Sequence, residues 1–402
     1  MVVINNGIDY KKNPKGNEEI PIYGTGGIIG YTNIALNEGP AVLTGRKGSI
    51  NRPFYLEGKF WNVDTIFCLK PIGANNAKWL YYSILNVDMT KLNEATGVPS
   101  ITSKSLYRLK IYYFEPDKQR EIAHILTTCD TVIEQTQSAI AKYKAIKQGL
   151  LHDLFTRGLD ANGRLRPCYE DAPKFYKESE LGMIPKEWAV KRLGDWCIVN
   201  PKTSELPESF VYIDLESVED GKLKHENYVS KKDAPSRAQR ILAKHDVLYQ
   251  MVRPYQKNNL YFNNNNENIK YVASTGYAQL RTKEYSLFLF YILHTDWFVN
   301  EVLIRCTGSN YPAINSSELQ SIYVAVPSGI EQEEIGERLN SIDNKIKTEE
   351  TLLQKYQSIK RGLMGDLLGG VKRCVCRDAM HGVSTNAPTT HPQPQTQKNK
   401  LP

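Results

Sequence analysis

The chain contains two copies of one long segment, and this internal repeat constrains its fold more than any other feature. The two copies align at a constant offset of 213 residues, without gaps from residue 99 to residue 154 of the first copy. The identical pairs at this offset include Pro99 and Pro312, Gln119 and Gln332, Asp130 and Asp343, and Lys147 and Lys360. A repeat of this length predicts two units of similar architecture within the 402 residues.

The repeated segments have the periodicity of long helices. Apolar residues recur at steps of three and four, which marks one face of an α-helix. In the second copy these positions are Ile335, Leu339, Ile342, Ile346, Leu353, Tyr356, Ile359, Leu363 and Leu367. Pro116 suits the first turn of the first helix, and Ser328 to Glu331 fits a capping box at the start of the second. We therefore predict helices over 116–158 and 328–368, each about 60 Å long at a rise of 1.5 Å per residue.

The apolar seam of each predicted helix is narrow, as it is in a coiled coil. A helix of this length with such a seam requires a partner that covers the seam. The simplest partner for the first helix is the second one.

A globular, β-rich region precedes each helix. Each region has an apolar strand candidate, at 40–43 and 246–249, followed by a basic loop and a further β-rich segment. We predict an α+β chain with these parts: globular β-rich unit 1–115, helix 116–158, linker 159–185, second globular unit 186–327, helix 328–368, and disordered tail 369–402.

Composition places the chain among ordinary globular proteins. Hydrophobic residues make up 41% and charged residues 24%, and the formal net charge of +7 is compatible with a nucleic-acid partner. No apolar run reaches the roughly 18 residues of a membrane span, and the N-terminus lacks the features of a signal peptide. We therefore expect a cytoplasmic protein with no membrane association.

The cysteines predict neither disulfides nor a metal site. Their number is 7, which is odd, and most are isolated in apolar surroundings, as reduced thiols are in cytosolic proteins. Cys374 and Cys376 lie close together near His381, but zinc requires more ligands at better spacing. We expect no bound metal.

Three segments invite a catalytic interpretation, and each lacks a necessary part. Gly24–Gly30 does not have the GxGxxG spacing or the strand–loop–helix context of a nucleotide site. Asn51–Phe54 resembles the loop with which adenine methyltransferases hold the target amino group, but no glycine-rich methyl-donor site precedes it. Glu57–Lys59 resembles part of a nuclease motif without the second carboxylate that holds the metal. We predict no catalytic residues and no cofactor.

Basic and amide side chains on loops remain as candidates for DNA contacts. Arg reads guanine, Asn and Gln read adenine, and Lys mostly contacts phosphate. The candidates in the first unit are Arg46, Lys47, Asn51, Arg52 and Lys104, with Arg108 beside them. Those in the second unit are Arg253, Tyr255, Lys257 and Asn258, with Gln256 and Asn259 in the same loop. The alternative for each of them is a solvated surface loop.

The order of parts resembles that of the specificity (S) subunit of type I restriction–modification enzymes. The segments that carry the resemblance are Pro116–Ile122, Leu150–Gly158, Ser179–Trp188 and Ile359–Leu368. The resemblance extends from residue 1 to about residue 368.

The resemblance implies a non-catalytic subunit. Each recognition domain would read one half of a split double-stranded DNA target. The two helices would pair as an antiparallel coiled coil with pseudo-two-fold symmetry, set the spacer between the half-sites and dock two methyltransferase (M) subunits. Motor-nuclease (R) subunits would join that core, and the partners would carry out methylation, ATP hydrolysis and cleavage.

Two segments depart from the resemblance. Ile184–Trp188 and the strand candidate near residues 191–193 have no counterpart in the first unit, which we expect to be N-terminally short. The sequence after Gly370 fits no part of the pattern. The alternatives are a DNA adenine methyltransferase, an inactive or truncated specificity-subunit variant, and a structural coiled-coil protein whose globular units bind another polymer.

Overall fold

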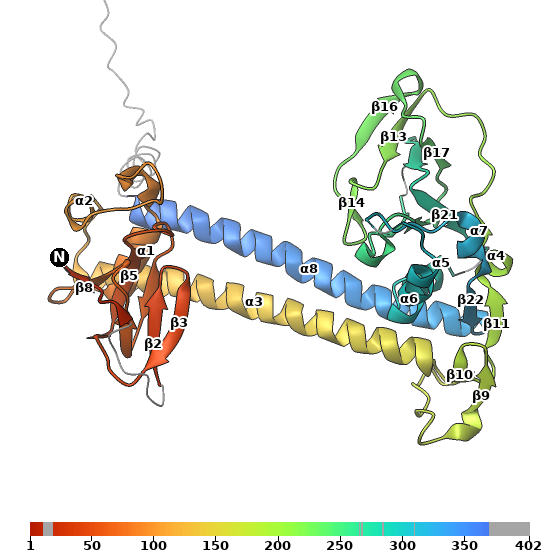
Figure 1. Ribbon diagram of the computed structural model, residues 1–402, viewed down its shortest axis with the longest axis horizontal. Coiled ribbons are helices and arrows are strands. Elements are labelled where there is room, and N and C mark those ends of the chain that lie inside the picture. Colours follow the sequence, from red (N-terminus) through yellow and green to blue (C-terminus); the bar gives the residue numbers. More distant parts are fainter. Residues whose placement is uncertain (11–18, 265, 267, 284, 309, 370–402) are drawn as a thin grey trace, which may run out of the picture. The chain divides into compact units, whose positions relative to one another are not determined.

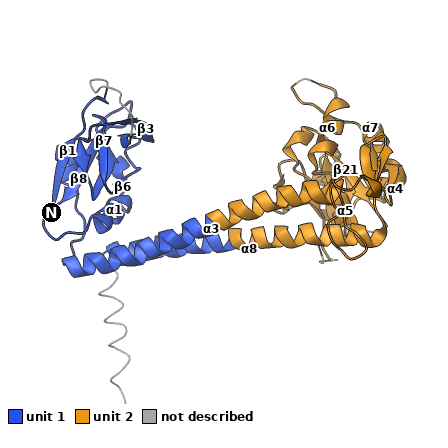
Figure 2. Cartoon of the chain, turned by 90° about the horizontal axis from the view of Figure 1, so that it is seen from below, with its two compact units in different colours: residues 1–137, 351–402 blue, residues 138–350 orange. Residues whose placement is uncertain are grey.

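The computed structural model describes residues 1–10, 19–264, 266, 268–283, 285–308 and 310–369. The chain divides into two compact units, shown in Figure 2: unit 1 comprises 1–137 and the chain from 351, and unit 2 comprises 138–350. The expected disordered tail lies outside the described residues apart from Gly369, and so do Cys374, Cys376 and His381.

The long helices α3 (Pro116–Thr156) and α8 (Gly329–Leu368) are labelled in Figure 1, and each contributes to both units (Figure 2). In unit 1, Ile122 and Leu126 of α3 share a core with Leu367 of α8. In unit 2, Leu154 of α3 shares a core with Ile335 and Leu339 of α8. Early residues of one helix therefore meet late residues of the other in each unit, and the helices pair antiparallel. The predicted α+β class with two long paired helices is confirmed.

Unit 1 contains two four-stranded sheets. The first has the order β1 (Val2–Asn6), β8 (Ile66–Pro71), β5 (Ala41–Gly45) and β6 (Phe54–Leu56), and its pairs are all antiparallel. The second has the order β3 (Gly27–Thr32), β2 (Ile20–Gly24), β7 (Lys59–Asn62) and β4 (Asn37–Glu38), with a parallel pair between β2 and β7.

Unit 2 repeats this arrangement strand for strand. Its first sheet has the order β12 (Ile198–Val199), β21 (Tyr277–Arg281), β18 (Val247–Gln250) and β19 (Leu260–Tyr261), again all antiparallel. Its second has the order β16 (Asn227–Ser230), β13 (Ser209–Ile213), β20 (Tyr271–Ser274) and β17 (Ala238–Ile241), with a parallel pair between β13 and β20. The two β-rich regions therefore share one topology although their sequences differ.

Helices join each first sheet to the long helices. In unit 1, α1 (Ala77–Leu85) contacts β5 and β8 and buries Trp79 completely. In unit 2, α5 (Ser286–Ile292) contacts β18 and β19 and buries Phe288. The other short elements are η2 (Met89–Leu92), α2 (Ser103–Tyr107), η3 (Pro173–Phe175), α4 (Leu193–Trp196), β14 (Val218–Glu219), β15 (Lys222–Leu223), η4 (Lys231–Asp233), η5 (Pro254–Gln256), α6 (Asp296–Ile304) and α7 (Ser316–Ser321).

The segment expected as a linker has structure of its own. It contains a hairpin of β9 (Tyr176–Ser179) and β10 (Gly182–Pro185), and β11 (Ala189–Arg192) follows and pairs with β22 (Tyr323–Val326). The buried carboxylate of Glu331 accepts hydrogen bonds from the Leu159 N–H at 2.7 Å, Arg166 Nη1 at 2.6 Å and Trp188 Nε1 at 3.1 Å. These bonds fix the path of the segment against the start of α8. The expected capping box therefore forms in part: the Glu331 N–H donates to Ser328 Oγ at 3.4 Å, while the Glu331 carboxylate holds the linker.

Among the described residues, no single helix is long and apolar enough to cross a membrane. By length and composition, α5 and α6 pass that criterion only as a pair bent by 66°.

Candidate nucleic-acid interface

Eight of the nine predicted contact residues lie in two equivalent loops. Residues 46–53 connect β5 to β6, and residues 251–259 connect β18 to β19. Because β5 and β18 hold the same place in sheets of the same topology, the two loops leave corresponding positions of the two units. Lys104 is the exception, since it lies in α2.

The same backbone contacts join each loop to a second segment. In unit 1, the Gly48 N–H donates to the Pro99 carbonyl at 2.8 Å, and the Ile101 N–H donates to the Arg46 carbonyl at 2.9 Å. In unit 2, the Arg253 N–H donates to the Pro312 carbonyl at 2.8 Å, and the Ile314 N–H donates to the Met251 carbonyl at 3.1 Å. Gly48 and Arg253 are therefore structural equivalents.

Arg253 and Gly48 share a left-handed backbone. The φ angle is 87° at Gly48 and 54° at Arg253. Glycine adopts such angles freely, whereas a residue with a long side chain does so at a cost in free energy. The Arg253 guanidinium lies over the ring of Tyr311, 4.3 Å from its centroid, and Tyr311 is 64% exposed. The site thus holds a guanidinium in a defined position at the surface, which suits contact with a base edge or a phosphate.

The other predicted residues of the unit 2 loop differ in their surroundings. Tyr255 is exposed. Lys257 donates to the His294 carbonyl at 3.0 Å and to the Asp296 carboxylate at 2.8 Å. The Asn258 N–H donates to Gln250 Oε1 at 3.1 Å. Tyr255 is therefore accessible to a ligand and Arg253 is half-buried, while Lys257 and Asn258 also hold the loop in shape.

The unit 1 loop shows the same division. Lys47 and Arg52 are exposed, and Arg52 lies 5.8 Å from the centroid of the Phe54 ring. Arg46 donates to the Asp64 carbonyl at 3.4 Å. Asn51 Oδ1 accepts a hydrogen bond from the Met89 N–H at 2.7 Å, so this amide fastens the loop to η2.

Lys104 lies beside a basic cleft of about 610 Å³ in unit 1. Its lining includes Lys91, Lys104 and Arg108 and one carboxylate, that of Glu94. Three cations around one concave surface suit the phosphates of a nucleic acid. Lys91 was not predicted from the sequence, because only the fold brings it to the same cleft as Lys104.

The unit 2 loop also contacts the half-buried imidazole of His294. His294 Nδ1 is 2.7 Å from the Phe290 carbonyl, and Nε2 is 3.4 Å from Asn259 Nδ2. Burial lowers the pKa of His294 to about 4, and the nearby Lys147 and Lys257 act in the same direction. The imidazole is therefore neutral at neutral pH and supports the segment that binds Lys257.

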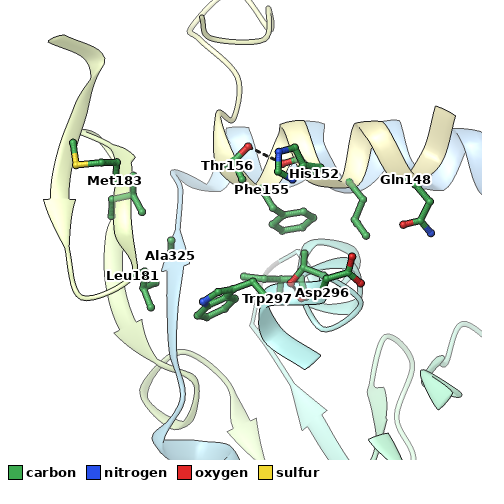
Figure 3. A pocket seen from close by; sticks show the side chains of 13 residues that line it. Gln148, His152, Phe155, Thr156, Leu181, Met183, Asp296, Trp297 and Ala325 are labelled. Atoms are coloured by element: carbon green, nitrogen blue, oxygen red, sulfur yellow. Dashed lines mark hydrogen bonds between the residues drawn. The ribbon is translucent and has the colours of Figure 1, made fainter. Parts of the chain in front are cut away.

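Unit 2 also contains an apolar cavity of about 240 Å³, shown in Figure 3. Phe155 of α3, Leu181 and Met183 of the hairpin, and Trp297 of α6 line it. His152 and Asp296 are also at its wall. Apolar walls of this kind suit a side chain better than a polar substrate. Among the described residues, no three His, Cys, Asp or Glu side chains are grouped so that they could hold a metal ion.

The sequence of the chain is similar to a known protein family. The profile "Type I restriction modification DNA specificity domain" matches residues 2–143 and 185–357. The MjaVIII type I restriction enzyme specificity subunit of Methanocaldococcus jannaschii is 26% identical over 305 residues, which cover 73% of this chain and 69% of that protein. The putative MjaX specificity subunit of the same organism is 26% identical over 283 residues, or 69% of this chain and 62% of that protein.

A solved structure shows the same fold. The S subunit of a type I restriction–modification system from M. genitalium superposes with a TM-score of 0.62 at 16% sequence identity. The match covers 91% of this chain and 93% of that one.

Proposed function

Because the chain belongs to the family of type I restriction–modification specificity subunits, we propose that each of its units reads one half of a split double-stranded DNA target. A specificity subunit is the non-catalytic component of its complex. In this proposal, α3 and α8 set the spacer between the half-sites and dock two methyltransferase subunits, which motor-nuclease subunits join. The complex acts in the cytoplasm.

The observation that carries the proposal is the pair of equivalent loops. Two β-rich regions of the same topology present loops that are held by equivalent backbone hydrogen bonds. Unit 2 has the guanidinium of Arg253 at a position where unit 1 has Gly48, which carries no side chain. Shared scaffolds with different side chains are what two readers of different half-sites require. The net charge of +7 and the basic cleft beside Lys104 favour a polyanionic ligand.

The test is a map of N6-methyladenine. The full chain is expressed with the methyltransferase subunits of its own system in a host without adenine methylation, and the genome is sequenced for modified adenine. We expect one motif, two short half-sites around a fixed gap, that disappears when this chain is omitted. Methylation that persists without the chain would contradict the proposal and favour the methyltransferase subunits as independent readers. Methyl-donor binding by the chain alone would support the alternative of an adenine methyltransferase.

A further inference from the structure

Each unit contains a three-residue contact among a tyrosine, an aspartate and a lysine where its β-rich region meets the long helices. In unit 2, the Tyr291 hydroxyl donates to Asp343 Oδ2 at 2.8 Å. Lys147 Nζ lies 2.7 Å from Asp343 Oδ1 and 5.5 Å from the centroid of the Tyr291 ring. We call Tyr291, Asp343 and Lys147 the unit 2 joint.

Unit 1 has the same contact. The Tyr82 hydroxyl donates to Asp130 Oδ2 at 2.7 Å. Lys360 pairs with Asp130 and lies 5.5 Å from the centroid of the Tyr82 ring. We call Tyr82, Asp130 and Lys360 the unit 1 joint.

The two joints occupy corresponding positions in the two copies of the internal repeat. Asp130 and Asp343 are 213 residues apart in the sequence, and so are Lys147 and Lys360. In each joint the aspartate comes from one long helix and the lysine from the other, with the helices exchanging roles. The tyrosine comes from α1 in unit 1 and α5 in unit 2, the helix that packs on the first sheet.

The contacts are partly shielded from water. The side chains of Asp343 and Lys147 are 32% and 26% exposed, and those of Asp130 and Lys360 are 27% and 17% exposed. Tyr82 and Tyr291 are buried, and burial together with the adjacent aspartate raises the pKa of each tyrosine far above its usual value. A charge-assisted hydrogen bond is directional and stronger than one between neutral groups. Each joint therefore resists both sliding of one helix along the other and rotation of the β-rich region on the pair.

We propose that the two joints determine which spacer length the protein accepts, because they fix the helix register and the seat of each recognition loop. The three residues of a joint are positioning residues: they act through the helices and sheets and do not touch DNA. This inference rests on the proposed function. It adds that spacer selectivity resides in these six side chains and is separable from the reading of bases by the loops.

The experiment uses the full complex and a plasmid library. The two half-sites found for the wild-type protein are cloned with the gap one base pair shorter, unchanged and one base pair longer. N6-methyladenine is then measured at every site in one reaction. We expect the wild-type complex to prefer the unchanged gap, and Asp343→Asn or Lys147→Met to reduce that preference by about tenfold, the effect of losing one charge-assisted contact. The base preference within each half-site should stay unchanged.

Four further variants separate positioning from folding. Lys142→Met removes an exposed lysine from the same helix and should keep the wild-type preference. Tyr291→Phe and its mate Tyr82→Phe each remove a single hydroxyl and should each broaden the accepted gap. Exchange of the charges, Lys147→Asp with Asp343→Lys, should restore selectivity relative to either single change.

Two results would overturn the inference. One is a set of joint variants that methylate the three gaps in the wild-type proportions, whatever their total activity. The other is a Lys142→Met control that broadens the gap as much as Lys147→Met does. Failure of the proposed function would look different, because the wild-type complex itself would then methylate no two-part site.

Discussion

At the scale of single residues, the most informative position is the left-handed one shared by Gly48 and Arg253. Arg253 could be predicted from the sequence because a basic loop that follows a strand is recognisable there. Tyr311 could not, since it lies 58 positions later in the sequence and reaches the guanidinium only because the Val252–Ala313 bridge brings the two segments together. Asn51 and Lys257 stay predicted DNA contacts, and their hydrogen bonds to Met89 and Asp296 depend on loop geometry that side-chain type does not reveal.

Replacing Arg253 by glycine should separate binding from stability. Glycine tolerates φ of 54° without strain and is the residue at the equivalent Gly48, so the loop keeps its shape. We expect Arg253→Gly to leave the urea midpoint of unfolding unchanged or slightly raised. Loss of a base contact should weaken the recognition of one half-site by about 1–3 kcal/mol, or roughly fivefold to 150-fold in methylation rate. A survey of all base substitutions in both half-sites checks this, and an equal effect on both halves would refute the two-reader arrangement.

Tyr311 should act through the guanidinium it supports. A partly exposed cation–π contact contributes about 0.5–1 kcal/mol, so Tyr311→Ala should weaken the same half-site two- to fivefold. Tyr311→Phe keeps the ring and should retain wild-type reading. Methylation rates on the wild-type target measure both, and a Phe variant as weak as the Ala variant would show that the hydroxyl, not the ring, matters.

His294 gives the stability of unit 2 a defined pH dependence. Its pKa is about 4 in the folded chain and near 6.5 when unfolded, so between these values only the unfolded chain binds the proton. The contribution of neutral His294 is complete above pH 6.5 and declines as the pH falls toward 4. Urea unfolding at pH 7.5 and pH 5 should therefore show a larger loss for the wild type than for His294→Gln, which cannot titrate. Equal losses would mean that His294 is protonated in the folded state.

At the scale of elements, three glycines in or next to the long helices differ in what surrounds them. Gly149 and its repeat mate Gly362 lie in helix interiors, and a Cβ at either meets no atom within 4 Å. Gly158, just after α3, has φ of 63°, and a Cβ there would lie 2.3 Å from Glu331 Oε1 and 2.5 Å from the Trp188 ring. The first pair weakens the helices, whereas Gly158 is required by the buried cluster around Glu331.

Alanine substitutions should change the free energy of unfolding in opposite directions at these positions. Gly149→Ala and Gly362→Ala should each stabilise the protein by about 0.5–1 kcal/mol, because alanine loses less backbone entropy on helix formation. Gly158→Ala should destabilise it by more than that, since it meets both a left-handed backbone and a filled space. Denaturant unfolding of the three variants checks the signs, and a stabilising Gly158→Ala would show that the Glu331 cluster rearranges readily.

The two long helices were predictable from the sequence because a period of three and four residues over some 40 positions has no other simple explanation. The predicted bounds 116–158 and 328–368 differ from α3 and α8 by at most two residues at any end. The hairpin of β9 and β10 was missed because each strand has only four residues, too few to show an alternating pattern. Arg166 and Trp188, on either side of the hairpin, bond to Glu331, which lies more than 140 positions further along the chain. Charged side chains that pair across such separations leave no local pattern.

At the scale of the whole molecule, the sequence predicted two like units but not their internal order. Strand candidates at 40–43 and 246–249 correspond to β5 and β18, yet nothing in them specifies that both occupy the third position of a four-stranded sheet. The parallel pairs β2–β7 and β13–β20 join strands far apart in sequence, and such pairing is set by packing of the whole sheet. The symmetry of the chain was therefore predictable from the repeated helix sequences. The sheets of the two units are alike only in strand order, which their sequences do not reveal.

Identical strand order in both units has a consequence for how the chain reaches its native state. During synthesis, the β-rich region of unit 2 emerges after that of unit 1, while unit 1 still lacks the end of α8 that completes its core. Neighbouring domains of one topology are prone to exchange equivalent strands and become trapped as misassembled species. Here the strands differ in length and side-chain pattern, so a strand of one unit is a poor substitute for its counterpart in the other. The difference in sequence between the two sets of sheets therefore disfavours strand exchange between the units while the chain folds.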